Sequence, residues 1–355
     1  MIEAYYARFA SAKFSKQRTD PPRSASQPSP SATSYSRNCY IKQQLSRLRY
    51  PEIPHKLSGM NRTFRKLKRE LIAGLSKIHL KQVKSDYFGM PLTVPIVYGI
   101  KNGGYIVPAE AWMGDCLKAF VSTKSGTVLD VGVNVGLYLV KLRHISKDIP
   151  YIGFEPSPSC LLYTQELIRL NEFKHAKLIP VALAEHDDVT RFYASKVGDE
   201  TGSLIKDHKQ GMSLAYSFDA LVMRGDDLIE KLGIDEISAI KIDVEEAEIF
   251  VMRGIVETLK KHRPYVYSEI LDVDDNAERT QRKNEVCELF AGLNYRIFGL
   301  TKNTNELKLI NDASAVGVDY LQEYIFCPEE NTDKFINAVK NNTAGINVKS
   351  VETQA

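Results

Sequence analysis

From Thr127 onward, the chain alternates short apolar runs with segments in which apolar residues recur every three or four positions. Short apolar runs are typical of strands buried on both faces of a sheet, and the longer periodic segments are typical of helices that pack on it. The alternation predicts βαβ units and a mostly parallel sheet flanked by helices, with two shorter strands that bracket a loop around residues 198–218. Main strands are expected near 127–132, 151–155, 177–183, 238–243, 264–270, 295–300 and 322–327, and helices near 108–121, 136–146, 158–171, 246–261 and 280–292.

The N-terminal part of the chain has a different pattern. Residues 21–36 are almost entirely Pro, Ser, Ala and Thr, which predicts disorder to about residue 45 because this composition buries little apolar surface. Over residues 61–82, apolar positions recur at helical spacing and the basic residues lie largely off that stripe, which predicts a basic amphipathic helix. Such a helix either lies on a membrane surface or packs on the main domain with its basic face in solvent.

These patterns divide the chain into four parts. We expect a basic, largely disordered segment (1–59), a basic amphipathic helix and linker (60–87), an α/β domain (88–330) and a polar C-terminal tail (331–355). Met60 is an alternative biological start. Residues 1–90 hold 18 Lys and Arg against 5 Asp and Glu, whereas the rest of the chain holds 29 against 39. A basic arm of this kind favours anionic surfaces such as lipid headgroups or nucleic acid.

The cysteines and the hydropathy exclude several protein classes. The five cysteines lie far apart, form no CxxC pair and are odd in number, which argues against a disulfide framework and a zinc site. The sequence contains neither a run of about 18 apolar residues nor the apolar core of a secretory signal. We therefore expect a soluble, cytoplasmic protein, with peripheral membrane contact if residues 61–82 dock on lipid.

The first predicted strand ends in a glycine-rich turn. Residues 130–136 have the pattern D-x-G-x-N-x-G and lead directly into a predicted helix. Glycine is needed where the backbone approaches a ligand closely or adopts dihedrals that a Cβ forbids, and this junction is where parallel α/β folds bind nucleotides. We assign Asp130, Gly132, Asn134 and Gly136 to a cofactor site.

A carboxylate follows at the end of the second predicted strand. Glu155 comes about 20 residues after the turn, where it can accept hydrogen bonds from both hydroxyls of a cofactor ribose. NAD and S-adenosylmethionine both contain such a ribose. The turn lacks the G-x-G-x-x-G arrangement that fits a pyrophosphate, and Asp130 suits a sulfonium cation better than an anion. The residues therefore favour S-adenosylmethionine, with an NAD-dependent Rossmann oxidoreductase as the alternative.

Several short motifs follow one another in a fixed order between Asp130 and Glu269. They are Asp130–Gly136, Phe154-Glu155-Pro156, Gly202-Ser203-Leu204, Asp226-Asp227-Leu228, Ile240–Glu245, Ala247-Glu248, Arg253-Gly254 and Arg263-Pro264 through Glu269. With these motifs the segment resembles the FkbM-type methyltransferases. The resemblance implies a Rossmann-like class I methyltransferase fold with a seven-stranded, mostly parallel sheet, and S-adenosylmethionine as donor. It also implies O-methylation of a hydroxyl on a glycan, a glycan precursor or a related natural product.

One position departs from the family pattern. Glu246 stands where the family usually has glycine. Asp243 and Glu246 form a D-x-x-E pattern, which is typical of helix capping. The alternative is that the Glu246 carboxylate narrows the acceptor pocket or changes its charge.

Acidic residues are expected to gather at the same edge of the sheet, after the fourth and fifth strands. A hydroxyl acceptor needs a general base, and a carboxylate can serve as one. The alternative is that acids near a helix N-terminus are simply favoured by the helix dipole. Clustered carboxylates also suit magnesium or calcium, but no spacing here fixes a metal, so we assign no metal ligand. The candidate catalytic residues are Asp243, Glu245 and Glu269, and the substrate-side candidates are Ser203, His208 and Glu248.

The expected partner is a small-molecule or glycan acceptor. Nucleic acid is not expected, because the basic residues lie on the N-terminal arm and the chain has no NPPY-type base-flipping motif. The departure at Glu246 and the basic arm leave a non-catalytic, cofactor-binding scaffold as a further alternative. The sequence does not predict the oligomeric state.

Overall fold

The structure is a computed structural model, which describes residues 81–97, 100, 111–196, 201–206, 216–271, 276–301, 306–311, 316, 320–342 and 346. The segment expected to be disordered, all but the last two residues of the predicted basic helix at 61–82, and His208 lie outside this set. None of the described helices is long and apolar enough to cross a membrane.

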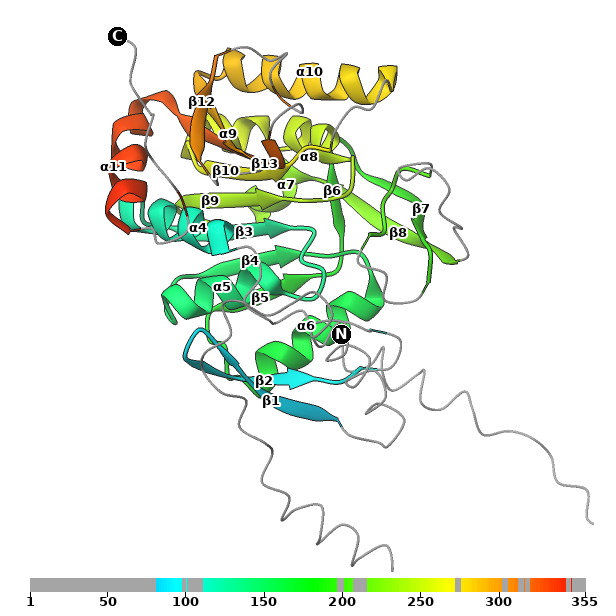
Figure 1. Ribbon diagram of the computed structural model, residues 1–355. Coiled ribbons are helices and arrows are strands. Elements are labelled where there is room, and N and C mark those ends of the chain that lie inside the picture. Colours follow the sequence, from blue (N-terminus) through cyan, green and yellow to red (C-terminus); the bar gives the residue numbers. More distant parts are fainter. Residues whose placement is uncertain are drawn as a thin grey trace, which may run out of the picture. The chain divides into compact units, whose positions relative to one another are not determined.

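The main sheet is built from β3 (Thr127–Val131), β4 (Tyr151–Phe154), β5 (Ala176–Ile179), β9 (Ile237–Ile242), β10 (Tyr265–Glu269), β11 (Tyr295–Thr301), β12 (Leu307–Ile310) and β13 (Tyr320–Pro328). The strand order is β12-β11-β13-β10-β9-β3-β4-β5 (Figure 1). Neighbours from β10 to β5 are parallel, and β13, β11 and β12 pair antiparallel. All seven expected strands are present, so the predicted Rossmann-like α/β fold is confirmed. The edge strand β12, which was not expected, makes the sheet eight-stranded.

Two smaller sheets accompany the main one. The hairpin of β1 (Gln82–Tyr87) and β2 (Met90–Pro95) turns at Phe88 and Gly89, both with positive φ. The second small sheet contains β6 (Ala182–Ala184), β7 (Asp188–Ala194) and β8 (Tyr216–Arg224), in the order β6-β8-β7. β7 and β8 are the shorter pair expected around residues 198–218. The β1–β2 hairpin was missed, because its first strand falls at the end of a segment expected to be helix and linker.

The helices are α4 (Ala111–Thr123), α5 (Leu137–Ile145), α6 (Pro158–Leu170), α7 (Gly225–Lys231), α8 (Glu248–Gly254), α9 (Val256–His262), α10 (Ala277–Gly292) and α11 (Thr332–Asn342). The single helix expected at 246–261 is divided into α8 and α9 at Ile255, whose φ is −121°. The chain also passes very close to β6 here, because a Cβ on Gly254 would lie 1.9 Å from the Ala184 carbonyl oxygen.

The C-terminal part of the chain differs from the polar tail that we expected. Residues 332–342 form α11, which packs on α4. Phe335, Ile336 and Val339 of α11 are buried in the same apolar cluster as Phe120. These apolar residues recur at helical spacing, but most residues of the segment are polar, so the composition favoured a tail over a helix.

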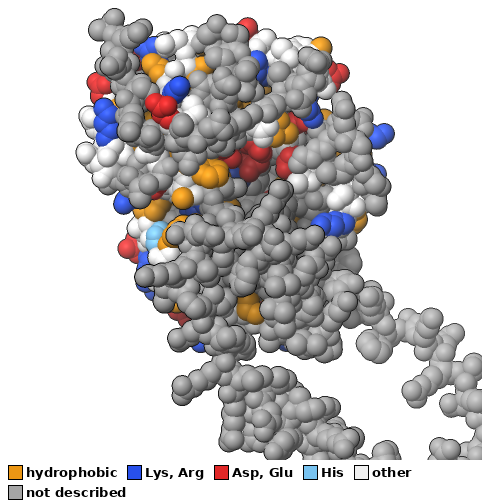
Figure 2. Space-filling model, in the orientation of Figure 1, with side chains coloured by type: hydrophobic (Ala, Val, Ile, Leu, Met, Phe, Trp, Pro, Cys, Tyr) orange, Lys and Arg blue, Asp and Glu red, His pale blue; other side chains and the backbone are white. Residues whose placement is uncertain are grey.

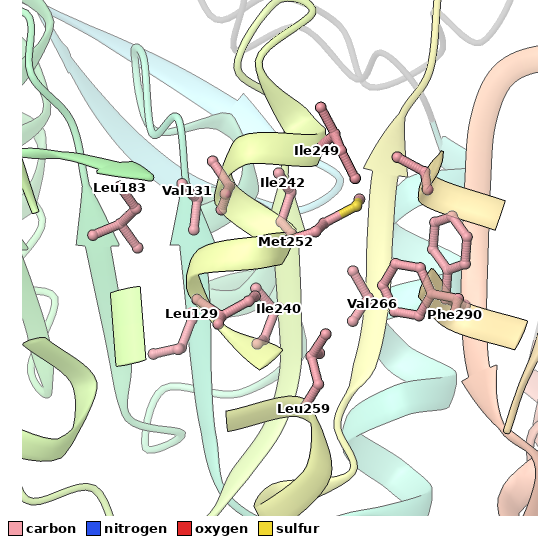
Figure 3. Close-up of a cluster of buried hydrophobic side chains, with 14 of the residues drawn as sticks. Leu129, Val131, Leu183, Ile240, Ile242, Ile249, Met252, Leu259, Val266 and Phe290 are labelled. Carbon is pink, nitrogen blue, oxygen red and sulfur yellow. The ribbon is translucent and has the colours of Figure 1, made fainter. Parts of the chain in front are cut away.

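Both faces of the central strands are buried, as the parallel topology requires. Successive residues of β3 and β9 point to opposite sides, so Leu129 and Ile240 join the cluster under α8 to α10, whereas Val128 and Ala239 join the cluster under α4, α5 and α11. Figure 2 shows acidic side chains near the middle of the face seen in Figure 1, and Figure 3 shows part of the first cluster. Apolar side chains therefore fill both faces of the sheet, and the polar residues of the predicted site lie at the carboxyl ends of its strands.

Candidate functional site

A pocket opens where the strand order reverses. β3 lies in the middle of the sheet, with β4 on one side and β9 on the other, and such a reversal leaves a crevice at the carboxyl ends of the strands. The pocket holds about 640 Å³ of space that protein atoms do not fill, part of it open to solvent. Its lining comes from the glycine-rich turn after β3, from 155–157 after β4, from the turn at 243–247 after β9, and from Phe192, Gly202 and Leu204.

The glycine-rich turn adopts backbone conformations that suit glycine. Gly132, Asn134 and Gly136 have φ values of 82°, 53° and 80°. A Cβ on Gly132 would lie 1.9 Å from the carbonyl oxygen of Asp243, and one on Gly136 would lie 2.9 Å from Cγ2 of Thr164 in α6. The two glycines are therefore needed both for their dihedrals and for the close approach of neighbouring elements.

Asp130 lies beneath this turn and is fully buried. Its Oδ2 accepts a 2.6 Å hydrogen bond from the Tyr151 hydroxyl, and its Oδ1 lies 3.5 Å from Nζ of Lys241. Burial raises the pKa of Asp130, although Lys241 and Tyr151 oppose the shift. Asp130 is not part of the pocket lining. Its carboxylate points toward Lys241 and Tyr151, so its assignment to the cofactor site stays a prediction in which Asp130 acts through these two partners.

Lys241 joins the turn after β3 to the end of β9. Its ammonium group donates a 2.8 Å hydrogen bond to the Gly132 carbonyl and lies 3.1 Å from Oδ2 of Asp243. Burial alone would lower the pKa of Lys241, but Asp243 and Asp130 outweigh burial and raise it. Lys241 was assigned no role from the sequence. The sequence did contain a sign of this role, which is a single lysine within an apolar strand. A buried lysine is almost always paired with a carboxylate.

Glu155 lines the pocket and is 5% exposed. Its two oxygens accept hydrogen bonds from the backbone N–H groups of Asn134 (2.7 Å) and Ser157 (2.8 Å). Burial raises its pKa to about 7, and the two backbone hydrogen bonds limit the rise. An ionised carboxylate has about four acceptor positions, so it can accept further hydrogen bonds from hydroxyl groups.

The turn after β9 carries the acidic residues. Asp243 and Glu245 line the pocket, and Glu245 has a left-handed φ of 56°. Glu248 is buried, and its Oε1 accepts hydrogen bonds from the N–H groups of Val244 (3.1 Å) and Glu246 (3.2 Å). Burial, with a contribution from Asp243 and Glu245, raises the pKa of Glu248 to about 8. Glu248 therefore stabilises the turn and does not line the pocket.

Ser203, expected on the substrate side, also stabilises this turn. It is 1% exposed, and its hydroxyl donates a 2.7 Å hydrogen bond to the Glu245 carbonyl. Its neighbours Gly202 and Leu204 line the pocket, but Ser203 does not. The Gly-Ser-Leu loop thus supplies the pocket with a backbone and an apolar side chain instead of a hydroxyl group.

Glu246 has neither of the two roles expected for it from the sequence. It does not line the pocket, and α8 begins after it without a side-chain cap. Its carboxylate instead forms ion pairs with Arg279 and with Arg282 of α10, the second at 2.8 Å. Neither arginine was singled out from the sequence, because contacts between distant elements leave no local pattern.

Glu269 lies at the end of β10, directly opposite Glu323 of β13 in the strand register. Burial raises its pKa well above the ordinary range, and the nearby acids Asp243, Glu323 and Glu245 raise it further. It does not line the pocket. Within the described residues, no three His, Cys, Asp or Glu side chains are arranged to hold a metal ion.

Comparisons with known proteins relate part of the chain to a family. Residues 130–297 match the family model of the methyltransferase FkbM domain. A search of curated proteins found no match. Among solved structures, an FkbM methyltransferase from Methylobacillus flagellatus KT is 16% identical, with a TM-score of 0.37 over 57% of this chain and 43% of that one. The chain therefore spans less than half of that protein.

Two further solved structures are similar over a larger part of this chain. A tRNA (uracil-54, C5)-methyltransferase from Pyrococcus abyssi, in complex with S-adenosyl-L-homocysteine, is 11% identical, with a TM-score of 0.34 over 70% of this chain and 44% of that one. A SAM-dependent methyltransferase from Aquifex aeolicus is 12% identical, with a TM-score of 0.32 over 60% of this chain and 86% of that one. Sequence identities and TM-scores this low do not indicate which acceptor the protein uses.

Proposed function

Residues 130–297 match the family model of the methyltransferase FkbM domain, and from this match we propose that the protein transfers a methyl group from S-adenosylmethionine to a hydroxyl group of a glycan, a glycan precursor or a related natural product. The observation that carries the proposal is the position of Glu155. This buried carboxylate lies in the pocket beside the glycine-rich turn and has acceptor positions left for the two ribose hydroxyls of the donor.

The chain's own residues would hold the donor from two sides. Glu155 would bind the ribose, while the backbone of Gly132 would let the methionine end pass close to the turn. S-adenosylmethionine, when bound, supplies a methyl group on a positively charged sulfur, and the acidic turn at 243–247 suits that charge. Methyl transfer is an in-line displacement, so the protein's main tasks are to align the two reactants and to limit water.

The charge of the pocket edge favours neutral or cationic acceptors. Asp243 and Glu245 line the pocket, and together with Glu248 they help to raise the pKa of Glu269. Lys241, which pairs with Asp243, is buried below the turn and is not part of the pocket lining. A phosphorylated or otherwise anionic acceptor would meet like charge here, whereas a sugar hydroxyl would not.

The base that removes the hydroxyl proton is best sought at Asp243 and Glu245, the two acids in the lining. Asp243 is held by its ion pair with Lys241, and Glu245 is held by the hydrogen bond from Ser203 to its carbonyl. General-base catalysis is worth about 10²- to 10⁴-fold in rate. We expect Asp243→Asn or Glu245→Gln to lower kcat by about that factor, with little change in the Kd for S-adenosylhomocysteine.

The test of the proposed function is a calorimetric titration of the full chain with S-adenosylmethionine and, separately, with NAD. We expect binding of S-adenosylmethionine that Glu155→Ala weakens by about 100-fold or more, and no binding of NAD. A panel of neutral, aminated and phosphorylated sugars then tests the acceptor class by methyl transfer. Binding of NAD alone would replace this proposal with the oxidoreductase alternative. Donor binding without transfer to any hydroxylated acceptor would favour a non-catalytic scaffold.

A further inference from the structure

The turn between β9 and α8 contains two successive left-handed residues, and neither is glycine. Glu245 has a φ of 56° and Glu246 a φ of 75°. Residues with a Cβ rarely adopt this conformation, and it persists only where surrounding structure enforces it. Glu246 also stands at the position where FkbM-type sequences usually have glycine, the residue that adopts such a φ without strain.

Two side chains hold the backbone of this turn. Ser203 donates its hydroxyl hydrogen to the Glu245 carbonyl, and Glu248 accepts the N–H groups of Val244 and Glu246. These bonds fix the peptide group between Glu245 and Glu246 and the N–H group of the residue before the pair. They do not involve the side chain of Glu246, which is the part that a glycine lacks.

The side chain of Glu246 is held from a different element. It is only 5% exposed, and its two oxygens pair with Arg279 and Arg282, which lie three residues apart on one face of α10. α10 packs against α8, the helix that follows the turn (Figure 1). The arginines therefore hold Glu246 from α10, and none of the three residues lines the pocket.

We propose that Glu246 is a positioning residue, which uses its ion pairs with Arg279 and Arg282 to keep the backbone of Glu245 and Glu246 left-handed. The ion pairs thereby hold Asp243 and Glu245 in the pocket wall, and they replace the conformational freedom that glycine provides at this position. The consequence for catalysis rests on the proposed function, but the effect on the turn does not. A simpler alternative is that the ion pairs only attach α10 to the turn.

The two explanations differ when two variants are compared with the wild type. The wild type and Glu246→Ala both have a Cβ, but only the wild type has the ion pairs, so the turn loosens in Glu246→Ala only if the ion pairs hold it. Glu246→Gly also lacks the ion pairs, but glycine accepts the left-handed conformation that alanine resists. The conformational cost of a Cβ in this region corresponds to about a five- to thirtyfold difference in the population of the native turn.

The experiment is hydrogen–deuterium exchange of the ligand-free full chain, followed on the amides of residues 243–248. We expect the Glu246→Ala variant to exchange about five- to thirtyfold faster than Glu246→Gly in this turn, and also faster than the wild type. Exchange in Glu246→Ala as slow as in the wild type, or no faster than in Glu246→Gly, would overturn the proposal. The matched control is Glu278→Gln, which removes the exposed carboxylate 3.8 Å from the same Arg282 and should leave exchange in the turn unchanged.

The exchange experiment includes a substitute variant and a binding measurement. If Glu246→Ala does not fold, Glu246→Gln takes its place, and this variant should still loosen the turn more than Glu246→Gly does; the reverse order would contradict the proposal. The Kd for S-adenosylhomocysteine is measured on the same samples. A wild-type chain that binds no S-adenosylhomocysteine would refute the proposed function, while the exchange rates would still decide the role of Glu246.

Discussion

The two sides of the pocket make similar turns by opposite means. After β3, the chain uses glycine at Gly132 and Gly136, where a Cβ would collide with a neighbouring element. After β9, it uses Glu245 and Glu246, whose left-handed backbone is held by side chains of Ser203, Glu248 and two arginines of α10. The first turn requires residues without a Cβ, whereas the second requires side chains that hold its backbone.

The two sides also differ in how many carboxylates they hold. Glu155 accepts two backbone N–H groups and lines the pocket. Across the pocket, Glu248 likewise accepts two backbone N–H groups, but Glu248 and Glu269 both lie close to other acids, and burial together with these acids raises the pKa of both. The glycine side thus presents one carboxylate to the pocket, whereas the acidic side gathers several.

The strongest test of this contrast adds one methyl group to the glycine side. In Gly132→Ala the new Cβ would lie 1.9 Å from a backbone oxygen and the φ would remain 82°, so the turn must move. We expect a loss of about 3 kcal/mol or more in the free energy of unfolding, together with loss of S-adenosylmethionine binding. Chemical denaturation and calorimetry measure the two effects.

The matched control for that substitution is Gly114→Ala, in helix α4. No atom lies within 4 Å of the Cβ that it would introduce, and this glycine has no positive φ. Alanine favours helix over glycine, so we expect a gain of about 0.5–1 kcal/mol. Equal effects of the two substitutions would show that the turn after β3 does not need glycine.

The next largest effect should come from Glu155. Replacing it with alanine removes a charged acceptor of two hydroxyl hydrogen bonds, each worth about 1.5–3 kcal/mol, so the Kd for S-adenosylmethionine should rise by about 100-fold or more. Calorimetry measures this change. Glu166→Ala is the control, because Glu166 is on the surface of α6, pairs locally with Arg169, and should leave the Kd unchanged. A Glu155→Ala variant with wild-type affinity would remove Glu155 from the cofactor site.

The pH dependence of binding offers a smaller and more specific test of the same side. The pKa of Glu155 is about 7, raised by burial above its ordinary value of 4.5, and the ribose hydroxyls need the ionised form. The Kd for S-adenosylmethionine should therefore rise about tenfold between pH 8 and pH 6, as the ionised fraction falls. Glu155→Gln should bind more weakly and show a flatter profile over this range.

Folding stability should respond to the same group in the opposite direction. Because the pKa of Glu155 is higher in the folded protein than in the unfolded chain, the folded state retains a proton that the unfolded state releases. The contribution of Glu155 to stability is therefore complete below pH 4.5 and is lost as the pH rises through about 7. Denaturation of the ligand-free protein and of Glu155→Gln between about pH 5 and pH 8 would detect this opposite trend.

The sequence predicted the parts of this molecule that repeat a local pattern. The strands at 127–132 and 238–243 were found because continuous apolar runs mark strands buried on both faces, and the glycine-rich turn was found because its residues are adjacent in the chain. Glu155 was placed by its position at a strand end. Each of these signals can be recognised from neighbouring residues of the sequence.

The features that the sequence missed depend on contacts between distant elements. Lys241 reaches Asp130 on the neighbouring strand, and Glu246 reaches Arg279 and Arg282 more than thirty residues away. Ser203 was recognised as part of a motif, but only the folded chain shows that its hydroxyl points to the Glu245 carbonyl. Local patterns thus identify which residues gather at the site, whereas tertiary contacts decide which of them face the pocket.

The smallest expected effect comes from removing a single oxygen on the acidic side. Ser203→Ala deletes a buried hydroxyl that donates to the Glu245 carbonyl at 2.7 Å and accepts the N–H of Ile205 at 3.0 Å. We expect a loss of about 1 kcal/mol in the free energy of unfolding, and faster amide exchange confined to residues 243–248 and the loop around Ser203. Ser122→Ala is the control, since its hydroxyl bonds to a carbonyl of its own helix and should change stability by less than about 0.5 kcal/mol. If Ser203→Ala left the turn as protected as the wild type, the left-handed pair would not depend on this hydroxyl, and the contrast between the two sides of the pocket would rest on Glu248 and Glu246 alone.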